Sequence, residues 1–329
     1  MIARGSASKH AWSNSASLVY NLTTAERRDK VARLFGNAGR QDCRFAQNSH
    51  LRIRRMSTPT PSAVEGPKLV HTAQELHAGV RAARTAGRTI GLVPTMGALH
   101  EGHLSLVRAA QAECGFTVVT IFVNPTQFAP HEDFDKYPRT LAADLAALAS
   151  CRADLVFAPS REEVYPAGCA TFVEPPPVAQ RWEGECRPGH FRGVATVVLK
   201  LFNLAQADAA FFGHKDYQQA AVIRRMVRDL NVPIEIRVCP TVREPDGLAM
   251  SSRNRYLSAD ERRQALAISR SLQLADQLAA GGERQAANLV GAMRGVLAEA
   301  QISRIDYVAV VDPETLEPVS ELAGPAIAL

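Results

Sequence analysis

The run FTVVTIFVN at residues 116–124 constrains the fold of this chain more than any other segment. Its residues are apolar or β-branched without polar alternation, which is typical of a parallel strand buried on both faces. Shorter runs of the same kind occur at 90–94, 155–158, 209–213 and 234–239. Because parallel strands need crossover connections, we expect an α/β fold with a doubly wound, Rossmann-like parallel sheet.

Segments of helical periodicity separate these runs and continue beyond them. The expected helices lie at 72–86, with Thr72 as N-cap, and at 102–114, 140–153, 194–207 and 217–230. After residue 242 the rhythm changes to two helices at 259–280 and 284–300 and one strand at 305–311. We therefore expect a nucleotide-binding catalytic domain over residues 66–242 and a small α+β lid domain over 243–329.

The first 65 residues differ in kind from the rest. They carry 11 Lys and Arg against 4 Asp and Glu, a formal charge of +7, while the remainder carries 27 against 29, or −2. We favour a non-functional extension or sequence upstream of a true start at Met56. A mitochondrial targeting segment is the second interpretation. An RNA-binding arm is the weakest, because aromatic residues are sparse there.

Composition excludes several other classes. The chain is 46% hydrophobic and 22% charged, which is ordinary for a globular protein. No apolar run approaches the roughly 18 residues of a membrane helix, so we expect no membrane span. The six cysteines form neither a CxxC pair nor a zinc-like cluster, which favours a reducing cytoplasm. The nearly neutral body beyond residue 65 argues against a nucleic-acid partner.

The segment PTMGALHEGH at 94–103 carries the strongest chemical signal. A strand runs through a glycine-containing turn into a helix start, where backbone N–H groups and the helix dipole attract phosphate. His100 and His103 on this turn can donate hydrogen bonds to a phosphate as charge builds on it. The alternative interpretation is that His100 and His103 are surface or core histidines near a tight turn, without a role in ligand binding. Neither a Walker loop nor a GxGxxG fingerprint is present.

Three further polar segments follow expected strands. Asn124 and Gln127 can fix a hydroxyl or carboxylate substrate, or form a capping turn. The segment GHKDYQQ at 213–219 offers a lysine for phosphate and an aspartate that could instead cap a helix. The segment DGLAMSSRNRY at 246–256 offers two hydroxyls and a guanidinium, either as a triphosphate clamp on a closing loop or as a solvated turn.

Together these segments resemble the pantothenate synthetase (pantoate–β-alanine ligase) family of the HxGH nucleotidyltransferase superfamily. The resemblance runs from about residue 68 to the C-terminus. It is carried by PTMGALHEGH (94–103), FVNPTQF (122–128), YPRT (137–140), HFRGVATVVLKLF (190–202), FGHKDYQQ (212–219) and DGLAMSSRN (246–254).

The resemblance implies an ATP-dependent ligase with no protein nucleophile. Pantoate carboxylate would attack the α-phosphate of ATP, giving pantoyl adenylate and Mg-pyrophosphate. The amine of β-alanine would then attack the acyl carbon, releasing AMP and pantothenate. Positioning and charge stabilisation would carry the catalysis. The resemblance also implies Mg²⁺ with the ATP, and a homodimer that binds only small-molecule substrates.

The resemblance also implies roles for individual residues. His100 and His103 would contact the phosphates, and Gln127 and Gln219 would hold pantoate. Asn124 would lie on the β-alanine side, with Tyr137 at a neighbouring lid position. The rest of the ATP site would comprise Met96, Gly213, Lys215, Asp216, Ser251, Ser252 and Arg253, of which Lys215 and Arg253 join the two histidines as catalytic residues.

Three departures from the family pattern bear on this expectation. Ala143 and Asp144 stand where the family usually has two acids, so a protein-side magnesium site would rest on Asp144, with Mg²⁺ held mainly by phosphates and water. His214 replaces a common glutamate. The chain stops at Leu329, before an expected strand and basic segment. The alternatives are an HxGH enzyme that activates another small hydroxy acid, and an inactive truncated relative.

Overall fold

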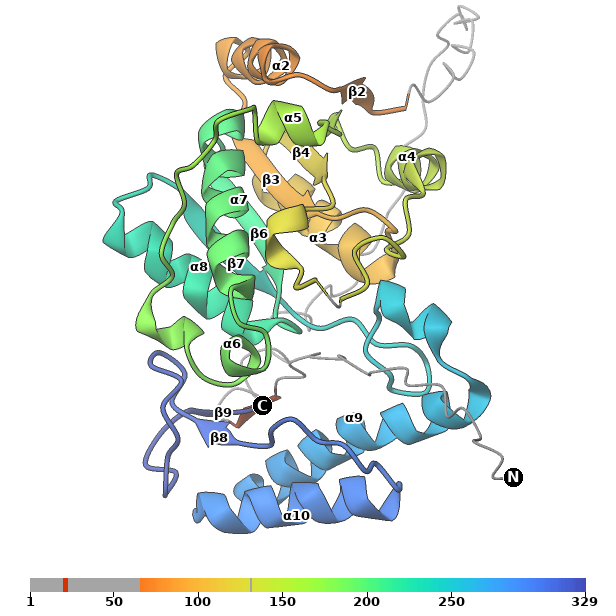
Figure 1. Ribbon diagram of the computed structural model, residues 1–329, viewed down its shortest axis with the longest axis vertical. Helices are drawn as coiled ribbons and strands as arrows, with labels where there is room; N and C mark the ends of the chain where they lie inside the picture. The colour runs from red at the N-terminus through yellow and green to blue at the C-terminus, as the bar shows by residue number, and fades with distance from the viewer. Residues whose placement is uncertain (1–19, 23–65, 131) are drawn as a thin grey trace, which may run out of the picture.

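The computed structural model describes residues 20–22, 66–130 and 132–329. Its main element is a six-stranded sheet in the order β2-β5-β4-β3-β6-β7, with every strand pair parallel (Figure 1). The strands are β2 (Lys68–Val70), β3 (Ile90–Thr95), β4 (Phe116–Ile121), β5 (Leu155–Phe157), β6 (Ala209–Gly213) and β7 (Glu235–Cys239). The expected parallel α/β sheet is therefore confirmed.

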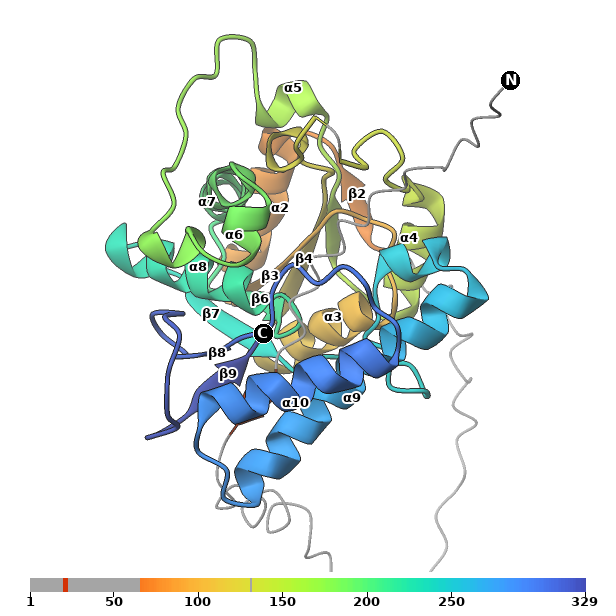
Figure 2. The same ribbon diagram turned by 60° about the horizontal axis from the view of Figure 1, so that its bottom comes forward.

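Helices cover both faces of this sheet. On β3, Ile90 and Leu92 pack with helices α2 (Ala73–Thr85), α7 (His190–Ala205) and α8 (Tyr217–Asp229). Val93 points to the opposite face and packs with α3 (Glu101–Glu113) and α4 (Leu141–Ser150). Figure 2 shows α2, α7 and α8 on one side of the strands and α3 on the other. Burial on both faces explains why the strands are continuous apolar runs, since each buried aliphatic side chain contributes roughly 1.5–3 kcal/mol.

The helix bounds are close to those expected. Thr72 caps α2 by accepting a hydrogen bond from the Glu75 N–H, and Glu75 returns the bond in a capping box. The helices are α2 (Ala73–Thr85), α3 (Glu101–Glu113), α4 (Leu141–Ser150), α5 (Arg161–Val164), α6 (Glu183–Cys186), α7 (His190–Ala205), α8 (Tyr217–Asp229), α9 (Ala259–Ala280) and α10 (Ala286–Glu299), with short 3-10 turns η2 (Pro125–Gln127), η3 (Pro177–Ala179) and η4 (Ser252–Tyr256).

A second, antiparallel sheet lies at the other end of the molecule. It has the order β1-β9-β8, formed by β1 (Tyr20–Leu22), β9 (Ala326–Ala328) and β8 (Val310–Val311). Ala326 and Ala328 pack against α9 and α10, while Ile327 points the other way, into a cluster with Tyr217 of α8. This sheet therefore joins the two C-terminal helices to the nucleotide-binding half.

One expectation needs correction here. The strand expected at 305–311 is formed only at Val310–Val311. Within the first 65 residues, Tyr20–Leu22 pair with β9; the rest of that segment lies outside the described residues, and its role stays a prediction. The proposed boundaries at 65/66 and 242/243 stay predictions. In the described part of the chain no helix is both long and apolar enough to cross a membrane, and the five described cysteines are free thiols.

Candidate active site

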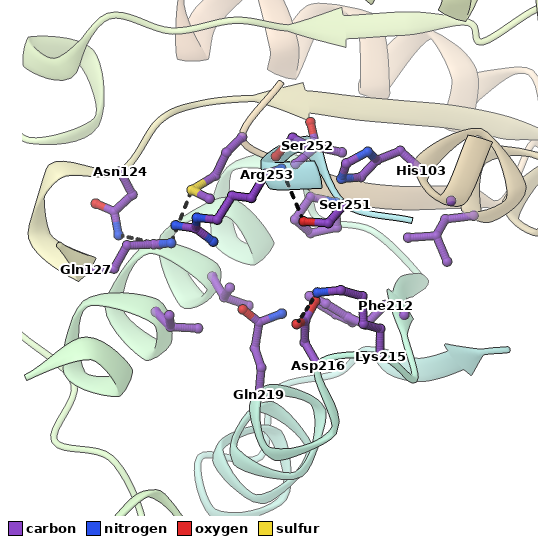
Figure 3. A pocket seen from close by; sticks show the side chains of 18 of the residues that line it. His103, Asn124, Gln127, Phe212, Lys215, Asp216, Gln219, Ser251, Ser252 and Arg253 are labelled. Atoms are coloured by element: carbon purple, nitrogen blue, oxygen red, sulfur yellow. Dashed lines mark hydrogen bonds and ion pairs between the residues drawn. The ribbon is translucent and has the colours of Figure 1, made fainter. Parts of the chain in front are cut away.

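A cavity of about 240 Å³ opens at the carboxyl ends of β3, β4, β6 and β7. This edge is the ligand-binding edge of doubly wound sheets, next to the point where the chain order reverses between β3 and β6. Except for Asp144, the candidate residues all line this cavity: Met96, His100, His103, Asn124, Gln127, Tyr137, Gly213, Lys215, Asp216, Gln219, Ser251, Ser252 and Arg253 (Figure 3). The fold thus gathers residues from five separate segments of the sequence.

The two histidines form the start of α3. His100 is the N-cap, and its Nδ1 accepts a hydrogen bond from the Gly102 N–H at 3.1 Å. The Nδ1 of His103 accepts from the His100 N–H at 3.3 Å. With Nδ1 occupied as an acceptor, the proton of each neutral ring lies on Nε2. The capping box therefore fixes two imidazoles, with centroids 4.1 Å apart, as Nε2–H donors.

Both rings are neutral at physiological pH. Burial, reinforced by the nearby Lys215 ammonium, lowers the pKa of His100 to about 4. Burial and the adjacent His100 lower the pKa of His103 to about 3. Gly102 lets the rings sit there, because a Cβ at this position would lie 2.8 Å from Cε1 of His100. The turn therefore supplies two uncharged side-chain donors at the start of α3.

Asp144 has a different place from the one expected. It is 3% exposed and does not line the cavity. Its oxygens accept hydrogen bonds from the N–H groups of Ala98 at 3.1 Å and Leu99 at 2.8 Å, and from the Thr140 hydroxyl at 3.3 Å. Ala98 has a φ of 51°, so the turn needs this support. The structure therefore shows Asp144 supporting the turn that precedes His100.

The described residues contain no cluster of three or more His, Cys, Asp or Glu that could hold a metal ion.

Asn124 and Gln127 follow β4 on the short turn η2. The Asn124 side chain is 1% exposed; its oxygen caps η2, and its amide donates to Gln127 Oε1 at 3.1 Å. The same amide donates to the Gly193 carbonyl at 3.2 Å, and a Cβ on Gly193 would lie 2.4 Å from the Thr126 carbonyl oxygen. Asn124 therefore does form the capping turn, and it also locks η2 against α7 and holds the Gln127 side chain.

The turn after β6 brings Lys215, Asp216 and Gln219 to the opposite side of the cavity from Gln127 (Figure 3). Asp216 occupies the N-cap position of α8 without a side-chain capping bond and accepts from Lys215 Nζ at 3.1 Å instead. Within the described residues the Gln219 amide has no hydrogen-bond partner, so its bonding capacity is available to a ligand. His214 lies outside the cavity lining and contacts Tyr217 edge to face.

The segment from Ser251 to Arg253 reaches the cavity from the C-terminal half. Ser251 caps η4 by accepting from the Arg253 N–H at 3.2 Å. The Ser252 hydroxyl lies 3.3 Å from the Tyr137 hydroxyl. The Arg253 guanidinium donates through Nε and Nη2 to both carboxylate oxygens of Asp133, at 3.2 and 3.1 Å. The side chains of Ser251, Ser252 and Arg253 thus lie close together at the cavity, as the binding of a triphosphate by this segment would require.

Three cavity residues were not anticipated from the sequence. Glu183, Arg187 and His190 line the cavity, and Arg187 bridges Glu183 at 2.9 Å and Glu132 at 2.7 Å. His190 Nδ1 lies 2.9 Å from the Gln127 carbonyl oxygen. Burial raises the pKa of the Glu183 carboxyl and lowers the pKa of His190 to about 4. The only signal for these residues in the sequence was the position of the HFRG block, and that position does not assign a role to any individual side chain.

These depressed histidine pKa values make stability depend on pH. His100, His103 and His190 titrate near 6.5 when unfolded and between about 3 and 4 when folded. Below pH 6.5 the unfolded chain therefore binds protons that the folded chain does not. The free energy of unfolding consequently decreases as the pH is lowered. For His190 alone the loss at pH 5.5 is about 1 kcal/mol. We expect Tm to fall from pH 7.5 to 5.5, and less steeply in a His190→Gln variant; a flat Tm in the native chain would contradict these pKa values.

Comparison with known proteins decides the family. The sequence pattern of the family described as pantoate-beta-alanine ligase matches residues 68–329. The chain belongs to the pantoate–β-alanine ligase family. It is 59% identical over 241 residues to pantothenate synthetase of Acidobacterium capsulatum, covering 73% of this chain and 81% of that protein. To pantothenate synthetase of Moorella thermoacetica it is 54% identical over 257 residues, covering 78% and 91%.

Solved structures agree with this assignment. Pantothenate synthetase from Thermus thermophilus superposes with a TM-score of 0.75 at 48% identity, over 79% of this chain and 94% of that one. A pantoate–β-alanine ligase from Francisella tularensis, complexed with beta-gamma ATP and β-alanine, has a TM-score of 0.61 at 37% identity, over 70% and 86%. The family match at 68–329 includes all six strands of the parallel sheet and strands β8 and β9 of the small sheet.

Proposed function

We propose that this cavity condenses pantoate with β-alanine, coupled to cleavage of ATP, through a pantoyl adenylate. The observation that carries the proposal is the meeting, in one cavity, of the neutral histidine donors of α3 and the glutamines from η2 and α8. The first set suits a polyphosphate, and the second suits a hydroxy acid. Family membership supplies the identity of the substrates.

The phosphate side is proposed to use donors from three segments. His100 and His103 offer Nε2–H groups, Lys215 a mobile ammonium, and Ser251 and Ser252 their hydroxyls. Arg253 adds a planar fork that matches phosphate geometry. Charge grows on the α- and β-phosphates as the bond to pyrophosphate breaks, so fixed donors aimed there lower the barrier. Mg²⁺ enters with the ATP as part of this substrate.

The pantoate side is proposed to lie between Gln127 and Gln219. Their amides would bind the two hydroxyl groups of pantoate. Pantoate also carries two methyl groups on one carbon, which need an apolar wall, and α7 supplies Val194, Val197 and Val198 to the cavity lining. Met96 contacts Gln127 through its sulfur, 3.1 Å from Nε2. A carboxylate held in this place lies within the same cavity as the phosphate donors.

The chemistry requires no covalent bond to the protein. A pantoate carboxylate oxygen attacks the α-phosphorus, and the bond to the pyrophosphate oxygen breaks. The neutral amine of β-alanine then attacks the acyl carbon, the bond to the phosphate oxygen breaks, and AMP leaves as the amine proton passes to solvent. The protein holds the reactants in line and excludes water from the adenylate.

The decisive experiment is AMP release by the purified chain from Mg–ATP and pantoate, with and without β-alanine. We expect AMP only with all substrates present, and pantothenate as the product. AMP with another small hydroxy acid but none with pantoate would overturn the substrate assignment. No AMP from a folded chain that binds ATP would overturn the activity.

Gln127→Ala should impair use of pantoate more than use of ATP. The change removes an amide that faces the cavity and leaves the histidine turn and the 251–253 clamp intact. We expect KM for pantoate to rise about tenfold, the value of a lost hydrogen bond to a bound polar group, with KM for ATP changed less than about twofold. Steady-state kinetics with each substrate varied in turn measures both constants. An unchanged pantoate KM and kcat would contradict the assignment.

We further propose a homodimer in a reducing compartment. The dimer follows from the resemblance described for the sequence, and the five free thiols of the described residues support the compartment. Light scattering on the purified chain tests the first, and a monomer at assay concentrations would overturn it.

A further inference from the structure

The segment at 132–137 is clasped to η4 by three contacts. Asp133 receives two hydrogen bonds from the Arg253 guanidinium, at 3.1 and 3.2 Å. The hydroxyls of Tyr137 and Ser252 are 3.3 Å apart, and the Tyr256 hydroxyl donates to the Lys136 carbonyl oxygen at 3.2 Å. Two segments about 120 residues apart in sequence thus meet beside the cavity.

The Asp133–Arg253 pair occupies one edge of the guanidinium that a triphosphate would use. A guanidinium carries five N–H donors, and here Nε and Nη2 each donate a hydrogen bond to a carboxylate oxygen. Arg253 lines the cavity, whereas Asp133 does not. The side chains are 30% and 24% exposed, so the pair is only partly screened by solvent. A phosphate that binds the Nε–Nη2 edge of Arg253 therefore replaces this carboxylate.

The neighbouring contacts show where movement would be confined. Glu132, the preceding residue, is held by Arg187 through Nε and Nη2 at 2.7 and 2.8 Å, with both side chains at 10% exposure or less. This pair does not involve Arg253. The release of Asp133 therefore leaves the segment anchored at Glu132 while the contacts to η4 open.

We propose that Asp133 is a positioning residue that holds Arg253 in the cavity until the triphosphate of ATP takes its place. The carboxylate is an anionic placeholder: it keeps the guanidinium aimed inward and is exchanged for phosphate when ATP binds. The exchange links nucleotide binding to release of the 133–137 segment from η4. This inference rests on the proposed function, because it takes Arg253 as a triphosphate contact.

Competition by Asp133 predicts a gain of affinity when its charge is removed. We expect Asp133→Asn to tighten binding of Mg–ATP about threefold to tenfold, because the phosphate no longer has to displace a charged competitor and a repulsive carboxylate is lost. Isothermal titration of the full chain with Mg–ATP, without pantoate, measures the change. Asp135→Asn is the matched control, with the same charge change on an exposed position of the same segment; its affinity should change less than about twofold.

The sign of the effect separates this mechanism from a purely structural contact. Loss of a structural ion pair would lower Tm and weaken ATP binding, which would overturn the proposal, as would no change. In an Arg253→Ala background, Asp133→Asn should have no further effect on ATP affinity, and tightening there would also overturn it. If Arg253→Ala alone binds ATP like the native chain, both the clamp and the exchange are wrong. If Arg253→Ala weakens binding but Asp133→Asn does not tighten it, only the exchange is wrong.

Discussion

We expect His103→Ala to lower kcat for pantoate-dependent AMP formation by about two to three orders of magnitude. The change removes an Nε2–H donor that stays fixed because the His100 N–H occupies Nδ1. Losing one preorganised donor to a developing negative charge costs about 3 kcal/mol in the transition state. The effect should fall mainly on kcat, because the donor strengthens as charge builds and contributes less to the bound ground state.

Single-turnover formation of pantoyl adenylate from Mg–ATP and pantoate measures this step apart from product release. His214→Ala is the matched control, since His214 lies on the turn after β6 but does not line the cavity; its kcat should stay within about threefold of the native value. Circular dichroism and Tm show whether each variant is folded. Native turnover in folded His103→Ala would exclude His103 as a phosphate donor.

Asp144→Ala is expected to reduce both stability and activity. The substitution leaves the N–H groups of Ala98 and Leu99 without their acceptor inside the protein, and unpaired buried donors cost about 1–3 kcal/mol each. We therefore expect the free energy of unfolding to fall by about 2–4 kcal/mol. Because this turn leads into His100, kcat should fall about tenfold as the donors lose alignment. Urea denaturation and steady-state assays measure the two effects.

The dependence on Mg²⁺ separates this account from a metal-binding role. Ala143 is exposed beside Asp144, so Ala143→Asp recreates an acidic pair without disturbing the turn. We expect the Mg²⁺ concentration for half-maximal activity to be unchanged in both Ala143→Asp and Asp144→Ala. A shift in either variant by more than about threefold would show that this position binds the metal after all.

The parallel sheet was predictable because its strands are buried on both faces, which leaves continuous apolar runs such as 116–124. The helix boundaries were less predictable from the sequence. Residues 194–207 were expected as a helix that begins after Gly193, yet α7 extends back to His190. Glycine weakens a helix by its local propensity, but here only glycine lets α7 approach the Thr126 carbonyl. Packing against a distant turn, which no local pattern reveals, decided that boundary.

The small sheet shows the same limit. The strand expected at 305–311 is formed only over Val310–Val311, where it pairs with the short strand β9. The other edge of β9 pairs with Tyr20–Leu22. Strand pairing depends on which segments meet, so a segment from the first 65 residues could not be placed by composition alone. Propensity describes a strand's own residues and says nothing of its neighbours.

The sequence by itself determined the fold class, the family and most of the polar residues that line the cavity, because those depend on local patterns and on motifs in a fixed order. The tertiary structure alone decided what each side chain faces. It turned Asp144 toward the backbone of Ala98 and Leu99, and it paired Arg253 with Asp133, about 120 residues away in the chain. It also fixed the proton of His100 and of His103 on Nε2. These outcomes depend on distances and hydrogen bonds between segments that come together only when the chain folds.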